Sequence, residues 1–234
     1  MLSKVKVIGF DADDTLWDNE PFYRQTEHKF CMLLKDFMDE ETLNNELYKT
    51  EIGNLALYGY GIKAFTLSLI ETAIRISKGN VTADIINQII ELGKQQLNEP
   101  VNLIDDVEKV LSSLKPHYKL IVATKGDLLD QEKKLQKSGL CNYFHHIEIM
   151  SDKGESNYSE LIRHLDISPN EFLMVGNSLK SDIIPVLNLG GYGAFVPYHT
   201  TWQHEYVDES NVKNERFIRL NTLSDLRIHL KDFE

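Results

Sequence analysis

Two aspartates lie two positions apart, directly after a short apolar run near the N-terminus. The run covers residues 5–10, and Asp11, Asp13 and Thr15 follow it. In extended backbone the side chains of residues i and i+2 point to the same side, so the two carboxylates converge. Such a pair repels itself and raises the pKa of one member unless a cation or a shared proton lies between them. The pattern therefore predicts a chemical site rather than a solvated acidic turn.

Further polar groups follow apolar runs later in the chain. Thr124 comes directly after a β-branched run, where its hydroxyl and the next backbone N–H can hold an anion. Lys153 lies after another apolar run and just before a helical pattern, a suitable place for a cation that contacts a phosphoryl oxygen. Asn177 and Asp182 lie in a turn that offers oxygen ligands beside the start of a helix. These groups are candidate partners of the two aspartates.

The candidates can meet only if the runs before them form one sheet. Five short apolar runs have the length and composition of buried strands, at residues 5–10, 120–123, 147–150, 172–175 and 194–196. Helical patterns alternate with the later runs, for example residues 131–139, which end at the C-cap candidate Gly139. This alternation predicts an α/β fold with a Rossmann-like parallel sheet, helices on both faces and a site at the carboxyl ends of the strands.

Strand-like runs are absent between Trp17 and Pro100, where apolar residues recur at helical spacing. One face begins at Ile62 and another at Ile85, with Thr82 as the candidate N-cap of the second helix. We therefore expect two domains: a core formed by residues 1–17 and 101–234, and an inserted helical domain formed by residues 18–100.

Residues 57–61 form a predicted loop within the helical insert. Its tyrosines, Tyr58 and Tyr60, stand beside glycines and are candidates for substrate contact, although an ordinary helix-connecting turn explains them equally well. Trp17 lies where the core passes into the insert, and contact with substrate or ordinary packing are equally compatible with that position. Both alternatives stay open at this point.

Composition excludes several classes of protein. The chain has 234 residues and a net charge of −11 with no local basic block, which disfavours nucleic-acid and anionic membrane partners. Its apolar runs are far shorter than the roughly 20 residues that span a bilayer, and its N-terminus lacks the features of a signal peptide. Cys31 and Cys141 are too few for a disulfide framework. We expect a cytoplasmic protein with reduced thiols.

The order of these motifs resembles that of the haloacid dehalogenase superfamily of phosphotransferases over nearly the whole chain. The four motifs read FDADDT, LIVAT, SDKGE and GNSLKSD, each after a predicted strand. The resemblance implies that Asp11 is a nucleophile and Asp13 a general acid and base. It also implies a Mg²⁺ ion held by the Asp11 carboxylate and the Asp13 backbone carbonyl, with Asn177 and Asp182 as further metal ligands. A hard cation with oxygen ligands suits these roles.

The same resemblance implies that Thr124 and Lys153 bind the oxygens of the transferred phosphoryl group. Lys125 and Lys180 are alternative cations, and we expect both to be mainly solvated, with Lys125 also a candidate for binding substrate.

The resemblance implies a phosphatase through an aspartyl-phosphate intermediate. True dehalogenases of the superfamily generally lack the second aspartate, so Asp13 favours hydrolysis of a phosphate ester. The insert after the first motif is similar to helical caps that close over small substrates, which points to a small phosphomonoester such as a nucleotide, flavin mononucleotide or a sugar phosphate. We expect a monomer or a homodimer.

One residue departs from the superfamily pattern. The fourth motif usually carries an acid directly after its glycine, but this chain has Asn177 there and keeps Asp182. An amide oxygen is still a ligand but lacks a negative charge, so we expect weaker Mg²⁺ binding. A phosphosugar mutase, a 2-haloacid dehalogenase and a catalytically silent phosphate-binding homologue stay open as alternatives.

Overall fold

The computed structural model describes residues 2–230, which divide into two compact units. The first contains residues 2–20, 101–125 and 131–230, and the second contains residues 21–100 and 126–130. The expected division placed the first boundary three residues earlier and did not foresee that residues 126–130 pack with the helical unit.

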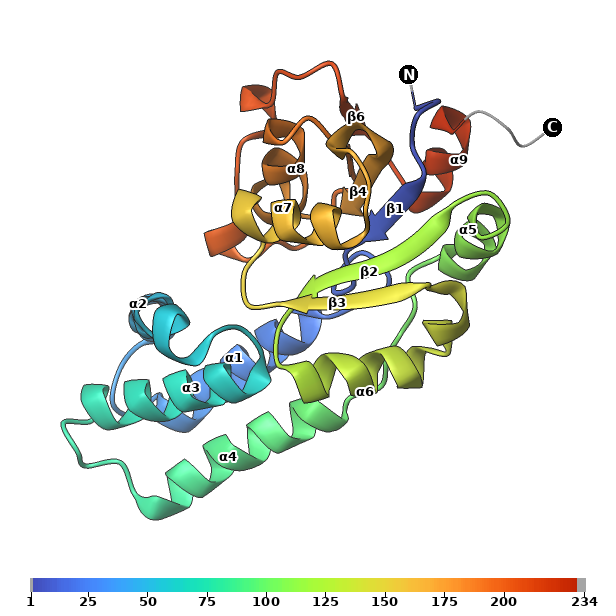
Figure 1. Cartoon of the computed structure of the whole chain (residues 1–234). Coiled ribbons are helices and arrows are strands. Elements are labelled where there is room, and N and C mark those ends of the chain that lie inside the picture. The colour runs from blue at the N-terminus through green and yellow to red at the C-terminus, as the bar shows by residue number, and fades with distance from the viewer. Residues whose placement is uncertain (1, 231–234) are drawn as a thin grey trace. The chain divides into compact units, whose positions relative to one another are not determined.

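Within the described residues, six parallel strands form one sheet in the order β3-β2-β1-β4-β5-β6 (Figure 1). The strands are β1 (Val7–Phe10), β2 (Lys119–Lys125), β3 (His146–Met150), β4 (Phe172–Gly176), β5 (Tyr192–Phe195) and β6 (Phe217–Arg219). The predicted α/β fold with a Rossmann-like sheet is confirmed. The sequence did not predict β6, because three residues are too few to show a periodic pattern.

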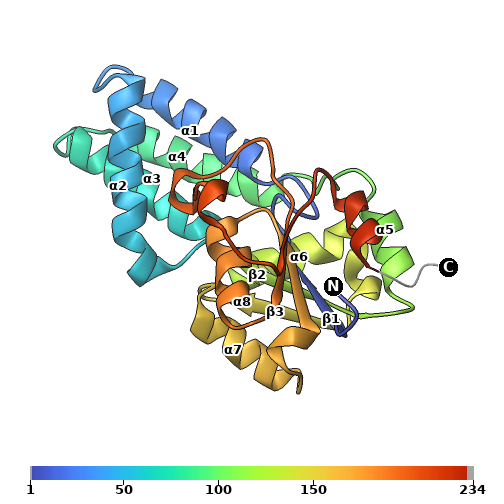
Figure 2. The same cartoon turned by 90° about the horizontal axis from the view of Figure 1, so that it is seen from above.

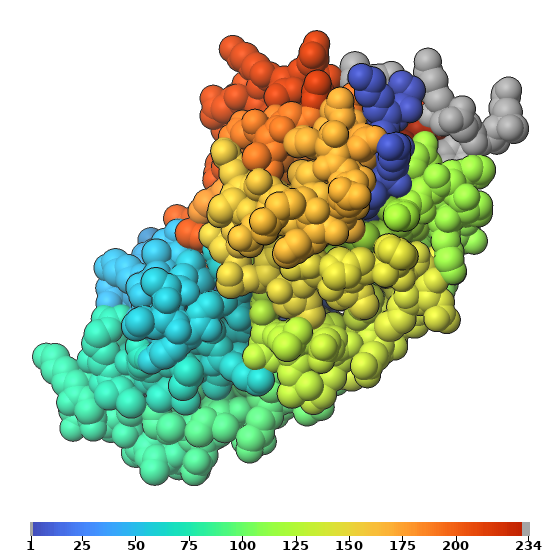
Figure 3. All heavy atoms as spheres, in the orientation of Figure 1, coloured from blue at the N-terminus to red at the C-terminus, as the bar shows by residue number. Residues whose placement is uncertain are grey.

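Alternating side chains of the central strands enter two separate cores. Ile8 and Phe10 of β1 pack with α5 (Val107–Leu114) and α6 (Leu128–Ser138), whereas Val7 packs with α7 (Glu155–His164). The helix α8 (Ile184–Asn188) packs on the same face of the sheet as α7, and the short α9 (Leu226–His229) packs on the opposite face. Figures 1 and 2 show these two layers of helices, and the yellow-orange atoms of α7 lie at the surface in Figure 3. Helices therefore cover both faces, as predicted.

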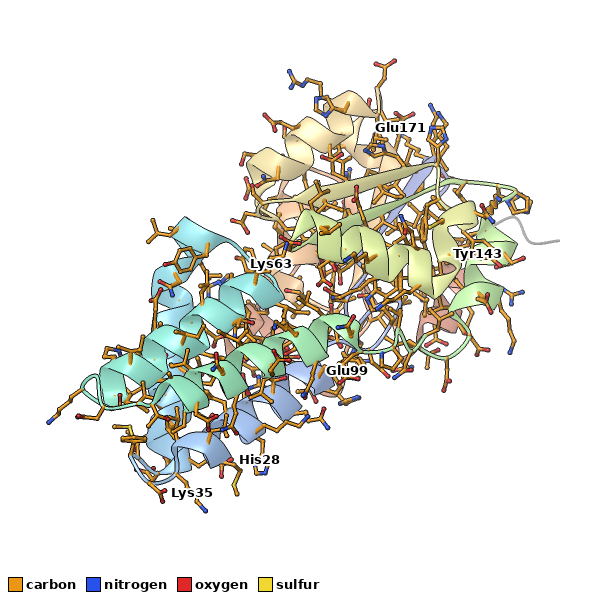
Figure 4. All side chains as sticks on the ribbon, turned by 90° about the horizontal axis from the view of Figure 1, so that it is seen from below. His28, Lys35, Lys63, Glu99, Tyr143 and Glu171 are labelled. Carbon is orange, nitrogen blue, oxygen red and sulfur yellow. The ribbon has the colours of Figure 1, made fainter. Side chains whose placement is uncertain are left out.

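The register brings the carboxyl ends of β1, β2 and β4 together. Phe10 is paired with Val122 of β2 on one side and with Val175 of β4 on the other. The backbone N–H of Asp11 continues the β4 pairing by donating to the Val175 carbonyl over 2.9 Å. The candidate residues that follow these strands thus share one edge of the sheet. Glu171, labelled in Figure 4, precedes β4 at the opposite edge.

The helical unit contains four long helices: α1 (Glu20–Leu34), α2 (Glu40–Tyr58), α3 (Ile62–Ile76) and α4 (Ala83–Asn98). Their apolar faces meet in one core that includes Phe30, Leu47, Leu69 and Ile89. The Thr82 side chain accepts a hydrogen bond from the Ile85 N–H, so its predicted N-cap role is confirmed. The helices predicted from Ile62 and Ile85 are α3 and α4.

The turn between α2 and α3 is shorter than the predicted loop, because α2 continues through Tyr58. Gly61 has φ 108, and a Cβ at this position would lie 2.9 Å from the Asp127 backbone nitrogen. The Lys63 ammonium, at the first turn of α3 in Figure 4, lies 2.9 Å from the Asp127 carboxylate. A close backbone approach and an ion pair therefore hold residues 126–130 in the helical unit.

Candidate active site

Asp11, Lys153 and Asp182 form a buried group at the carboxyl edge of the sheet. The Lys153 ammonium donates to Asp11 Oδ1 and, over 2.7 Å, to Asp182 Oδ1. Burial raises the pKa of Asp11 to about 7, and the Asp182 and Asp13 carboxylates add to this rise while Lys153 opposes it. Burial alone would lower the Lys153 pKa, but the two carboxylates hold it well above its ordinary value. The structure thus brings together three residues that the motifs singled out separately.

Thr15 joins the first motif to the fourth. Its hydroxyl lies 3.1 Å from Asp11 Oδ2 and 3.3 Å from Asn177 Oδ1, and it accepts a hydrogen bond of 3.1 Å from the Asn177 backbone N–H. Thr15 belongs to the first motif, but its sequence position alone predicts no role for it. One hydroxyl therefore contacts both Asp11 and Asn177.

Asp182 lies in a π-helical turn, η3 (Leu179–Ile183), directly before α8. Its second carboxylate oxygen accepts a hydrogen bond of 2.9 Å from the Ser178 backbone N–H. A Cβ at Gly176 would lie 2.3 Å from Asp182 Oδ2, so the glycine at the end of β4 is what allows the carboxylate to occupy this place. Single π-helical turns are frequent at functional sites.

These residues fit a hard divalent cation by the chemistry of their donor atoms. Within residues 2–230 no group of three or more His, Cys, Asp and Glu side chains is arranged to hold a metal ion. The oxygen donors are instead two buried carboxylates, of Asp11 and Asp182, together with the amide oxygen of Asn177. Mg²⁺ prefers such oxygen ligands and is usually bound by one or two carboxylates.

Asp13 accepts hydrogen bonds from three side chains, none of which contacts Asp11 in the bonds described above. Its carboxylate accepts from the Trp17 indole N–H over 2.8 Å, from the Lys134 ammonium over 2.9 Å and from the Gln131 amide over 3.1 Å. Trp17 is only 1% exposed, so it supports Asp13 from within the core. In this structure Trp17 is packed in the core and donates a hydrogen bond to the second aspartate, and its contact with substrate stays a prediction.

Gln131 and Lys134 are site neighbours that the sequence analysis missed. They stand three positions apart on α6 and so share one face of that helix. The Gln131 amide also donates to the Thr124 hydroxyl over 2.7 Å, which connects Thr124 to Asp13. The available signal was a pair of polar residues at helical spacing in the helix directly after the Thr124 strand.

Lys125 is not the solvated cation that we expected. Its side chain is 14% exposed, and its ammonium lies 2.7 Å from Glu205 Oε1 and 2.9 Å from the Ser181 hydroxyl. That expectation failed because Glu205, 80 positions away in the chain, supplies a half-buried partner that no local pattern reveals. Lys180 is exposed as expected, and its ammonium donates to the His204 carbonyl over 2.9 Å.

The two candidate tyrosines lie in the helical unit. The Tyr58 hydroxyl donates to Glu71 over 2.9 Å, and Tyr60 is half-buried. Their contact with substrate stays a prediction.

Asp14, the third acid of the first motif, binds backbone N–H groups at the start of α1. Its backbone is left-handed, with φ 61, and its carboxylate accepts from the backbone N–H groups of Asn19 and Glu20. Burial raises its pKa to about 8. Asp14 therefore anchors the chain where it leaves the core at the start of α1.

Comparison with known proteins agrees with the motifs. The family model of haloacid dehalogenase-like hydrolases matches residues 5–190. The chain is 26% identical over 200 residues to mouse N-acylneuraminate-9-phosphatase, covering 81% of each protein. It is 21% identical over 193 residues to a pyrimidine 5′-nucleotidase from Escherichia coli strain K12, covering 78% of this chain and 82% of that protein.

A solved structure of a haloacid dehalogenase-like family hydrolase from Xanthomonas campestris is similar over almost the whole chain. Its TM-score is 0.87 at 34% sequence identity, covering 97% of this chain and 90% of the other. In the part of the chain that the structure describes, no helix is both long and apolar enough to cross a membrane.

Proposed function

The chain belongs to the haloacid dehalogenase-like hydrolases, and from this premise we propose that it is a Mg²⁺-dependent phosphatase of a small-molecule phosphomonoester. The observation that carries the proposal is the buried contact of Lys153 with both Asp11 and Asp182. Asp13, in the same motif as Asp11, has separate partners and accepts a hydrogen bond from Lys134. This arrangement offers a nucleophile, a cation and a separate proton carrier within one edge of the sheet.

In the first step, a carboxylate oxygen of Asp11 attacks the phosphorus atom. The bond between phosphorus and the ester oxygen breaks, and Asp13 donates a proton to that leaving oxygen. The products of this step are the free alcohol and a phosphoryl group on Asp11. Lys153 stabilises the charge on the phosphoryl oxygens during the transfer.

In the second step, a water molecule attacks the same phosphorus atom. Asp13, now a carboxylate, takes a proton from this water, and the bond between phosphorus and the Asp11 oxygen breaks. Inorganic phosphate leaves, and both aspartates return to their initial states. Thr124, whose hydroxyl is held by Gln131, offers a further contact to the phosphoryl oxygens.

Asp11, Asp182 and Asn177, with the Asp13 backbone carbonyl, would hold the Mg²⁺ ion, which when bound neutralises charge on the phosphoryl group. Asn177 replaces an acid, so the chain should need more Mg²⁺ than a relative with aspartate at that place. Asn177→Asp should lower the Mg²⁺ concentration for half-maximal activity with little change in the saturated rate. An unchanged Mg²⁺ titration would remove Asn177 from the proposed metal shell.

The substrate class rests on the relatives and on the helical unit. One relative is named an N-acylneuraminate-9-phosphatase and another a pyrimidine 5′-nucleotidase. We propose that the unit of residues 21–100 and 126–130 acts as a cap that admits small substrates.

A time course with p-nitrophenyl phosphate and Mg²⁺ tests the proposed reaction. The proposal expects continuous release of phosphate that stops on chelation of the metal. A single phosphorylation without turnover would favour the mutase, and no reaction at any Mg²⁺ concentration would favour the silent homologue, which Asn177 supports. A panel of sugar, nucleotide and flavin phosphates would then identify the substrate.

A further inference from the structure

Glu205 is a half-buried carboxylate that no motif includes, and it contacts Ser178 and Ser181, which lie next to candidate site residues in the chain. It lies in the short turn η4 (Gln203–Glu205), within the segment that connects β5 to β6. Burial alone would raise its pKa, but the Lys125 ammonium and hydrogen bonds from Lys125, Ser178 and Ser181 lower the Glu205 pKa to about 2. The carboxylate is therefore ionised at neutral pH and belongs to a fixed network.

The network reaches across the strand that carries the nucleophile. Lys125 ends β2, whereas Ser178 and Ser181 follow β4, and β1 lies between these two strands in the sheet. The Lys125 side chain must therefore pass the carboxyl end of β1, where Asp11 begins, to reach Ser181 over 2.9 Å and Glu205 over 2.7 Å. Lys125 directly follows Thr124, and Ser181 directly precedes Asp182, so both partners of this contact are chain neighbours of candidate site residues.

We propose that Glu205 is a positioning residue that holds the Lys125 ammonium away from the phosphoryl group, so that Lys125 does not bind it directly. This inference rests on the proposed phosphatase function and adds a residue that tunes its affinity. Lys125 and Glu205 are 14% and 13% exposed, so the pair is shielded from competing water. Two serines also hold Glu205: Ser178 donates to it over 2.6 Å, and Ser181, which accepts from Lys125, donates to the same oxygen.

Holding Lys125 away from the phosphoryl group would affect KM and the release of product. An additional cation at the phosphoryl site would bind the substrate, the transition state and the product phosphate alike. Such uniform binding lowers KM without raising kcat, and tight product binding slows release. By neutralising Lys125, Glu205 leaves the transferred group to Lys153, which contacts the nucleophile itself.

Calorimetric titration of inorganic phosphate into the Mg²⁺-loaded full chain measures the effect without catalysis. In Glu205→Gln the amide can still accept from the serines while the charge that holds Lys125 is lost. We expect phosphate to bind about fivefold or more tightly, because the positive charge of Lys125 is then no longer offset by the Glu205 carboxylate. KM should fall and kcat should not rise. Glu209→Gln, in the same segment but in an exposed pair with Arg219, is the control and should bind phosphate like the wild type.

The double variant Lys125→Gln/Glu205→Gln separates restraint from direct binding. Restraint predicts that it binds phosphate like the wild type, because it removes both charges and no phosphoryl contact. A direct Lys125 contact predicts about a tenfold or greater loss, since a charge-assisted hydrogen bond would disappear. This variant also decides the question if the single variant does not fold.

The two proposals fail in different ways. The role of Glu205 is overturned if Glu205→Gln binds phosphate no more tightly than the wild type, or if neither of these two proteins binds phosphate. A large loss of phosphate affinity in the double variant would overturn it as well. Absence of phosphomonoester hydrolysis by the wild type would instead overturn the proposed function.

Discussion

At the scale of single residues, the two aspartates of the first motif have different surroundings. Asp11 contacts a buried ammonium that it shares with Asp182, whereas Asp13 faces an indole N–H, an amide and a second ammonium. Identical side chains two positions apart thus meet different chemistry. Sequence spacing predicted the pair, but most of the partners that distinguish its members are distant in sequence: Gln131 and Lys134 lie on α6, and Lys153 follows β3.

Replacing Asp13 by asparagine tests its proposed role in proton transfer. Asp13→Asn should reduce turnover by about 10²- to 10⁴-fold, because an amide can neither donate to the leaving oxygen nor activate water. The loss should be smaller for an ester with a good leaving group, which needs less protonation. Rates with p-nitrophenyl phosphate and an alkyl phosphate give the comparison. Equal losses for both substrates would contradict the acid role.

Lys134 should matter for Asp13 although no motif contains it. Lys134→Met removes the ammonium that lies 2.9 Å from both Asp13 and Asn19, so the carboxylate loses one of its three donors. We expect kcat to fall about tenfold with little change in KM, because the effect concerns proton transfer rather than binding. Lys133→Met, at the exposed neighbouring position, is the control. Equal kcat values for the two variants would remove Lys134 from the account.

At the scale of elements, the sequence predicted the strands and helices that have a regular local pattern of apolar residues. The central strands are apolar and short, and α3 and α4 carry regular apolar faces, so their positions were predicted within a few residues. The strand β6 and the helix α5 were missed because each has few residues and packs through contacts distant in sequence. The place of residues 126–130 depends on the turn at Gly61, which no periodicity encodes.

The turn between α2 and α3 should tolerate only glycine at position 61. Gly61→Ala should destabilise the protein by about 2 kcal/mol, because alanine is strained at φ 108 and its Cβ would meet the Asp127 backbone. Gly53→Ala, inside α2 with no atom within 4 Å of a new Cβ, should stabilise it by about 0.5–1 kcal/mol. Urea denaturation followed by circular dichroism measures both. Destabilisation of equal size in the two variants would contradict the turn geometry.

At the scale of the whole molecule, the site is assembled from the ends of parallel strands. Asp11, Thr124, Lys153 and Asp182 are far apart in the chain, yet their strands are neighbours in one sheet and end at one edge. Strand ends in the sequence therefore predicted that these residues lie at one edge, whereas their roles in the reaction stay a proposal. The sequence could not predict Glu205, Gln131 or Lys134, because their roles come from side-chain contacts across the molecule.

The half-buried Glu205 also links the stability of the molecule to pH. Its pKa is lowered from 4.5 to about 2, so its ionised form stabilises the fold above pH 4.5 and this contribution is lost as the pH falls toward 2. The stability advantage of the wild type over Glu205→Gln should therefore shrink by about 2 kcal/mol between pH 6 and pH 3. Urea denaturation of both proteins at the two pH values measures it. An advantage that is constant with pH would contradict the lowered pKa.

The most direct test of the central claim is to locate the transferred phosphoryl group on the protein. Wild-type protein turning over p-nitrophenyl phosphate with Mg²⁺ is quenched in acid and treated with borohydride, which reduces an aspartyl phosphate to homoserine. Peptide mass spectrometry should then find homoserine at position 11, and Asp11→Asn should show neither this product nor turnover. Intact Asp11 in protein that is releasing phosphate, together with more than a few per cent of the wild-type rate in Asp11→Asn, would contradict the account.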